Sequence, residues 1–178
     1  MEEIKIFENL LEADERWTAF FRRGENDEPI PTSLKAEYEA VEKIQLNANV
    51  PEDVQSQFNI ARMLRVYAWL YYPLHQVAEL KAFSTVEMAL KFEFPAVKGL
   101  RNLLSTAIQA GRITDAGFSH INPKEGDPTF YSRSLLDNLP PLRNDLAHGS
   151  AMSHPGSLFT LRNCSEIINQ IFPSEFKQ

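Results

Sequence analysis

Residues 51–94 read PEDVQSQFNIARMLRVYAWLYYPLHQVAELKAFSTVEMALKFEF, which is two helical patterns separated by a proline. In the first pattern, apolar side chains recur at three- and four-residue steps, at Phe58, Ala61, Leu64, Ala68 and Tyr71. This spacing places them on one face of a helix. Pro51 suits a first helical turn and Pro73 ends the helix. A second long helix is expected from His75 to about Phe94, antiparallel to the first because the connection is short.

The same periodicity continues toward the carboxyl end of the chain. The apolar stripe over residues 100–108 predicts a helix that Gly111 ends. Further helices are expected over residues 130–139, 141–148 and 157–172, with a loop over 113–127. Strand-like alternation is almost absent. The sequence therefore predicts an all-α protein whose residues 52–172 form an antiparallel helical bundle.

The first 46 residues suggest a helical hairpin packed on that bundle. Apolar side chains from Ile4 to Phe21 recur at helical steps, and Gly24 follows them. A proline-broken loop over Glu25–Thr32 comes next, and Ser33 is placed to cap a helix that runs to about Ile44. The expected organisation is one domain over residues 1–178.

Composition excludes several classes of protein. The chain has 178 residues, of which 43% are apolar, as expected for one packed domain. Its one cysteine, Cys164, can form neither an internal disulfide nor a thiolate zinc site, and we interpret it as a core residue. The four histidines lack ligands at metal spacing, so no metal or other cofactor is expected. Without a signal peptide pattern or a bilayer-length apolar run, we expect a cytoplasmic protein with no membrane partner.

The distribution of charge locates any anion site. The net charge of −6 argues against avid nonspecific binding of nucleic acid, which depends on the phosphates that Lys and Arg neutralise. Residues 95–178 carry eight basic and seven acidic side chains, whereas the first 94 residues are strongly acidic. An anion site is therefore expected in the second half of the chain.

Two acidic residues lie in the apolar sector of the helix expected over residues 75–94. On a helical wheel, Glu79 and Glu87 fall among the apolar side chains Leu80, Phe83, Val86, Leu90 and Phe94. A carboxylate there requires a cation or hydrogen-bond donors, because burial without partners costs several kcal/mol. The alternative is an exposed position, where Glu87 would pair with Lys91 four residues later.

The segment PPLRNDLAHG, residues 140–149, combines an arginine, an amide and an imidazole in one short helix. Asn144 and His148 are four residues apart and share a face, and imidazole is the side chain that exchanges protons near neutral pH. Arg143 and His148 diverge by about 140° on an ideal helix, so they converge only through the reach of the arginine or local unwinding. The alternative is structural: both side chains cap the helix and pair with Asp145 or Glu87.

The string LRNDLAHG resembles the Arg-x4-His signature of the HEPN superfamily, small four-helix bundles of which many are ribonucleases. The resemblance covers about residues 52–172 and leaves residues 1–46 outside. It matches Arg143, Asn144 and His148 to the signature, with Glu87, or Glu79 as second choice, as the accompanying acid. The sequence departs from the family at residues 153–156, Ser-His-Pro-Gly, which interrupt the long helix that usually follows the signature.

The resemblance implies metal-independent cleavage of RNA by attack of a ribose 2′-hydroxyl on the adjacent phosphate. His148 would act as general acid or base, Arg143 would stabilise the phosphorane, Asn144 would orient a partner, and Glu87 would hold Arg143. One imidazole does not easily serve as both acid and base, so a homodimer with a shared cleft is expected. A toxin or defence role implies an antitoxin protein as a further partner. The alternatives are a non-catalytic HEPN-like module that binds RNA, a nucleotide or a protein, and a purely structural helical dimer.

Overall fold

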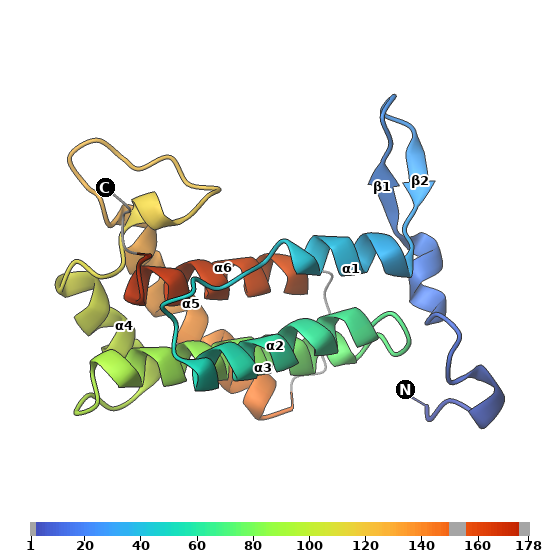
Figure 1. The fold of residues 1–178 in the computed structure, drawn as a ribbon, viewed down its shortest axis with the longest axis horizontal. Helices are drawn as coiled ribbons and strands as arrows, with labels where there is room; N and C mark the ends of the chain where they lie inside the picture. The colour runs from blue at the N-terminus through green and yellow to red at the C-terminus, as the bar shows by residue number, and fades with distance from the viewer. Residues whose placement is uncertain (1–2, 150–155, 175–178) are drawn as a thin grey trace.

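The computed structural model describes residues 3–149 and 156–174, and it confirms the all-α prediction. Its helices are α1 (Leu34–Glu42), α2 (Glu52–Tyr67), α3 (Leu74–Glu93), α4 (Leu100–Gln109), α5 (Phe130–Ala147) and α6 (Ser157–Ile171). A two-stranded antiparallel hairpin, β1 (Phe21–Arg23) and β2 (Pro29–Pro31), projects from one end of the molecule (Figure 1). Short 3-10 helices cover Phe7–Asn9, Glu15–Ala19 and Asp115–Gly117.

Helix α3 is the centre of the bundle, and it packs against α2, α4, α5 and α6. Its connection to α2 is a short turn, so these two helices are antiparallel as predicted. Helices α3 and α6 run in the same direction, because His75 hydrogen-bonds to Ser157 and Glu79, one turn later, to Thr160. This parallel pair is compatible with antiparallel successive helices, since α4, the following loop and α5 return the chain to the start of α3 before α6 begins.

Aliphatic and aromatic side chains from all the bundle helices form one continuous core. Cys164 on α6 is fully buried within it, as predicted. Burial in this core, together with the nearby charge of Glu79, raises the pKa of the Cys164 thiol far above its usual range. The thiol therefore stays protonated and unreactive in the folded protein.

Helix α5 passes through Pro140 and Pro141 without ending, although the sequence predicts separate helices over 130–139 and 141–148. Pro140 has no N–H to donate to the carbonyl of Leu136. Arg101 on α4 supplies a donor instead: Nη1 lies 2.8 Å from the Leu136 oxygen, and Nη2 pairs with Asp137 at 2.8 Å. This contact from another helix satisfies the carbonyl that Pro140 leaves without a backbone donor.

A carboxylate from the preceding loop caps the start of α5. Asp115 is buried and accepts hydrogen bonds from the backbone N–H of Tyr131 (2.9 Å) and from the backbone N–H and hydroxyl of Ser132 (2.8 and 2.7 Å). Burial alone would raise the pKa of Asp115, but these hydrogen bonds outweigh it and lower the pKa below its usual value. At the other end, α5 stops at His148 and Gly149, and Gly149 adopts a positive φ of 87°.

The predicted N-terminal helical hairpin is wrong, because residues 4–21 form no α-helix and contain only two short 3-10 helices before β1 begins. Asp14 is extended, and its backbone N–H donates to the Trp69 oxygen at 2.9 Å. Trp17 is buried, with its indole N–H donating to the Ala68 oxygen at 3.0 Å. These contacts anchor the segment to the turn after α2 and override its helical periodicity. The predicted helix α1 is present, and the Ser33 hydroxyl caps it by accepting from Ala36 N.

Candidate functional site

The centre of the candidate site is an ion pair between Arg143 on α5 and Glu87 on α3. Arg143 Nη2 lies 3.3 Å from Glu87 Oε2, and Lys91 Nζ lies 2.8 Å from Glu87 Oε1. The Glu87 side chain is 17% exposed, so the pair sits at the edge of the core. One carboxylate lies between two cations, and the cluster carries a net positive charge in an otherwise acidic protein.

The guanidinium of Arg143 is only partly used by these contacts. Its Nη1 lies 3.4 Å from Asn144 Oδ1, which is a weak hydrogen bond. Its buried Nε has no hydrogen-bond partner among the described residues. The Nη1 and Nη2 groups carry four N–H bonds, of which these contacts use two, so Arg143 retains donors for an oxyanion such as a phosphate.

An open hollow of about 680 Å³ lies beside this ion pair. It is lined by Ser84, Glu87, Met88, Lys91, Phe92, Pro95 and Arg143. Phe92 is 50% exposed, so one wall of the hollow is an aromatic ring near two cations. This combination suits a ligand that is both anionic and aromatic. Sequence reasoning missed Met88 and Phe92, although their spacing from Ser84 places them on the Glu87 side of α3.

The structure does not bring His148 into this cluster. His148 is exposed at the carboxyl end of α5, and its backbone N–H donates to the Asn144 oxygen at 2.9 Å. Among the described residues, no hydrogen bond or ion pair joins its imidazole to Arg143, Asn144 or Glu87. Because α5 stays helical to Ala147, we expect the Arg143 and His148 side chains to diverge as they do on an ideal helix.

The two acids predicted to need partners occupy different environments. Glu79 is buried between α3 and α6 and accepts a hydrogen bond from the Thr160 hydroxyl at 2.7 Å. Glu87 contacts Arg143 and Lys91 at the hollow. Of the two acids, Glu87 is therefore the one that contacts Arg143.

The described residues hold no cluster of three or more His, Cys, Asp or Glu side chains that could bind a metal ion. His154 and the interruption at residues 153–155 lie outside the described part of the chain. Within the described residues, no helix is both long and apolar enough to cross a bilayer. Comparison of the chain with protein-family models, curated proteins and solved structures gives no match. The site is therefore interpreted from its own residues and from the motif.

Proposed function

We propose that this protein is a HEPN-like, metal-independent endoribonuclease that acts as a cytoplasmic homodimer. The observation that carries the proposal is Arg143: it belongs to the Arg-x4-His motif, Glu87 holds it at an open hollow, and its guanidinium keeps unused donors. A toxin or defence role, with an antitoxin protein as partner, follows from the resemblance.

In the proposed reaction, a ribose 2′-hydroxyl attacks the adjacent phosphorus. The bond to the 5′-oxygen of the next nucleotide breaks, and the products are a 2′,3′-cyclic phosphate and a 5′-hydroxyl. Arg143 hydrogen-bonds to the non-bridging oxygens, whose negative charge grows in the phosphorane. The Glu87 carboxylate keeps the guanidinium directed at the hollow. Asn144 orients either the substrate or the imidazole.

Two proton transfers accompany this step, one from the attacking hydroxyl and one to the leaving oxygen. His148 performs one of them, and the His148 of a second copy performs the other. The exposed position of His148 at the end of α5 is compatible with a cleft that two copies share, because the ring is not enclosed by its own chain. The dimer is therefore part of the proposed mechanism.

A second candidate is a non-catalytic HEPN-like module that binds RNA, a nucleotide or a protein. The separation of the His148 imidazole from Arg143 within one chain favours it, as does the net charge of −6. In this module, Arg143 and Lys91 would bind the ligand without cleaving it.

The two candidates are separated by incubating labelled single-stranded RNA with the purified protein in the presence of EDTA. The nuclease is expected to release cyclic-phosphate products and to leave a 2′-deoxy substrate intact. The variants R143A and H148A should each lose about 10²–10⁴-fold in rate. R133A is the control, because Arg133 lies on the same helix and pairs with Asp127 away from the hollow. RNA that stays intact but binds in an Arg143-dependent manner would support the module instead.

A further inference from the structure

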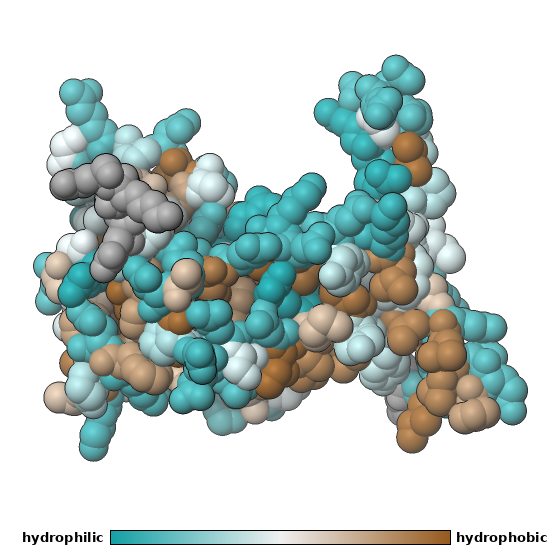
Figure 2. All heavy atoms as spheres, in the orientation of Figure 1, coloured by the Kyte–Doolittle hydropathy of each residue, from teal (hydrophilic) through white to brown (hydrophobic). Residues whose placement is uncertain are grey.

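Residues 3–12, here called the arm, expose an unusual amount of apolar surface. The exposed fractions are 96% for Ile4, 63% for Ile6, 82% for Phe7, 45% for Leu10 and 86% for Leu11. Figure 1 shows the arm extending beyond the turn between α2 and α3, and Figure 2 shows apolar side chains gathered at that end of the molecule. Such a concentration on a protein surface marks a binding interface.

The base of the arm is firmly attached. The Asp14 carboxylate accepts hydrogen bonds from Tyr72 N (2.9 Å) and from Arg16 Nε (2.8 Å). The indole of Trp17 is buried against the same turn. The arm is therefore held out from a fixed base at the Tyr67 end of α2.

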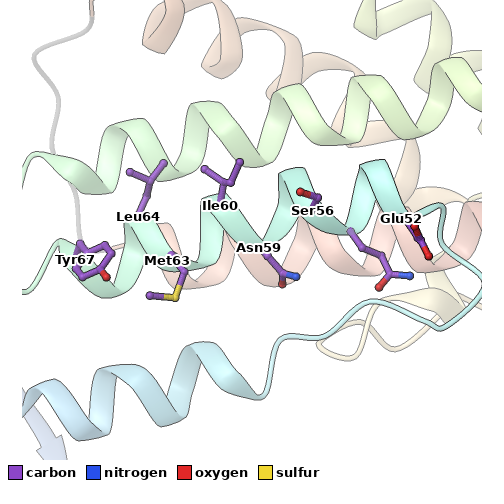
Figure 3. Close-up of a pocket in the computed structure, with 8 residues that line it drawn as sticks. Glu52, Ser56, Asn59, Ile60, Met63, Leu64 and Tyr67 are labelled. Atoms are coloured by element: carbon purple, nitrogen blue, oxygen red, sulfur yellow. The ribbon is translucent and has the colours of Figure 1, made fainter.

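A groove begins at that same end of α2; its half next to Tyr67 is apolar, and its other half is lined by Glu52, Gln55, Ser56 and Asn59. The α2 groove is a hollow of about 680 Å³, whose apolar lining is Ile60, Met63, Leu64 and Tyr67 (Figure 3). Ile60, Met63 and Tyr67 are 45%, 42% and 51% exposed. They are spaced at i, i+3 and i+7, which is the pattern with which a helix binds another helix.

The arm carries the matching pattern. Ile4, Phe7 and Leu11 are also spaced at i, i+3 and i+7, and this periodicity predicts a helix. In the single chain only a 3-10 turn forms, at Phe7–Asn9, and it buries no side chain. Isolated helices of this length are marginal in water, so a groove that accepts the apolar stripe is what would complete the helix.

We propose that the arm of one copy docks as a short helix in the α2 groove of a second copy, and that the exchange is reciprocal. Each chain carries both complementary surfaces, so a twofold arrangement satisfies both arms at once. Covering each large side chain removes roughly 60–120 Å² from water. The three stripe side chains of each arm and the grooves that they cover then bury roughly 700–1,400 Å², which spans the range from weak to standard interfaces. This inference goes beyond the proposed nuclease and does not depend on it.

The test is sedimentation velocity of the full chain over a wide range of concentration, without RNA. We expect a reversible dimer whose dissociation constant rises at least about 30-fold in the arm variant F7D and in the groove variant M63D. F21D is the control: Phe21 is 58% exposed on the hairpin but lies outside arm and groove, so its variant should dimerise normally. Hydrogen exchange of amides 6–12 should slow as the dimer forms.

Several outcomes would overturn the proposal. A monomer at all concentrations with protected arm amides would mean that the arm occupies its own groove. A monomer with unprotected arm amides would mean that these surfaces serve another partner. A dimer that tolerates either F7D or M63D would place its interface elsewhere on the molecule. A monomer at all concentrations would also count against the homodimeric nuclease, whereas a dimer that tolerates F7D or M63D would overturn the arm exchange alone.

Discussion

Replacement of Asp115 by asparagine should destabilise the protein through the start of α5. The buried carboxylate accepts three hydrogen bonds from Tyr131 and Ser132. Hydrogen bonds to a charged group contribute about 1.5–3 kcal/mol each, and the amide oxygen of asparagine retains part of them. The NH₂ group of asparagine takes the place of the second carboxylate oxygen and cannot accept a hydrogen bond. We expect the free energy of unfolding to fall by roughly 2–4 kcal/mol, and a value of about 3 kcal/mol lowers the Tm by about 6–12 °C.

The loss of stability in D115N should depend on pH. Because the folded-state pKa of Asp115 is lowered from 3.8, its contribution to stability is present above the unfolded pKa. That contribution is lost as the pH falls through the folded pKa. Urea unfolding of wild type and D115N should therefore show the full difference in the free energy of unfolding at pH 7, and a smaller difference as the pH falls below about 4.

The control for this experiment is D137N on the same helix. Asp137 is 73% exposed and pairs with Arg101, so its replacement should cost no more than about 1 kcal/mol. Equal stability of wild type and D115N at pH 7, or a difference that grows on acidification, would refute the assignment of Asp115 as the cap of α5.

Three further predictions concern α3, α4 and α6. Replacing Arg101 by alanine should lower the free energy of unfolding by about 0.5–1.5 kcal/mol in the wild-type protein. The same replacement should cost less in the P140A variant, because the alanine at position 140 donates its own N–H to the Leu136 oxygen. Equal losses of stability in the two backgrounds of a thermal double-mutant cycle would exclude this role of Arg101. E79A should lower the free energy of unfolding by roughly 1–3 kcal/mol, since the Thr160 hydroxyl loses its closer acceptor and keeps only the Gly156 oxygen at 3.4 Å. E87A should chiefly slow RNA cleavage, and the reverse pattern would make Glu79 the supporting acid. Cys164 should react with a thiol reagent only as the chain unfolds, so that labelling in a urea series follows the unfolding transition. Rapid labelling of the native protein would contradict the burial of the thiol and its raised pKa.

The helices with strong apolar stripes and local boundary signals could be predicted from the sequence. Helices α2, α3 and α4 follow from their periodicity, and Pro51, Pro73 and Gly111 mark their limits. Residues 4–21 have a similar periodicity, but the contacts of Asp14 and Trp17 with the turn after α2 determine their conformation. Long-range contacts of this kind leave no local signal.

The continuity of α5 could not be predicted from the sequence for the same reason. The donor that compensates for Pro140 comes from Arg101, 35 residues before Leu136, the residue whose carbonyl it satisfies. A sequence window that spans one helix contains the prolines but not this arginine.

The candidate site was predictable in part. The wheel position of Glu87 and the motif arginine both pointed to a charged contact, and the structure joins them. Met88 and Phe92 were missed, because an apolar side chain on a mostly buried helix predicts core until its exposure is known. The direction of the His148 ring depends on where α5 ends, which spacing does not determine.

Mixing wild type with an inactive variant tests the central claim, a cleft built by two copies, most directly. A dimer of one wild-type chain and one H148A chain retains a single imidazole, whereas the proposed reaction needs the imidazoles of both copies. The account predicts that wild type cleaves single-stranded RNA in EDTA, and that an excess of H148A at saturating RNA lowers this rate by drawing wild-type chains into mixed dimers. Wild type that leaves RNA intact, or a rate that excess H148A leaves unchanged, would contradict it.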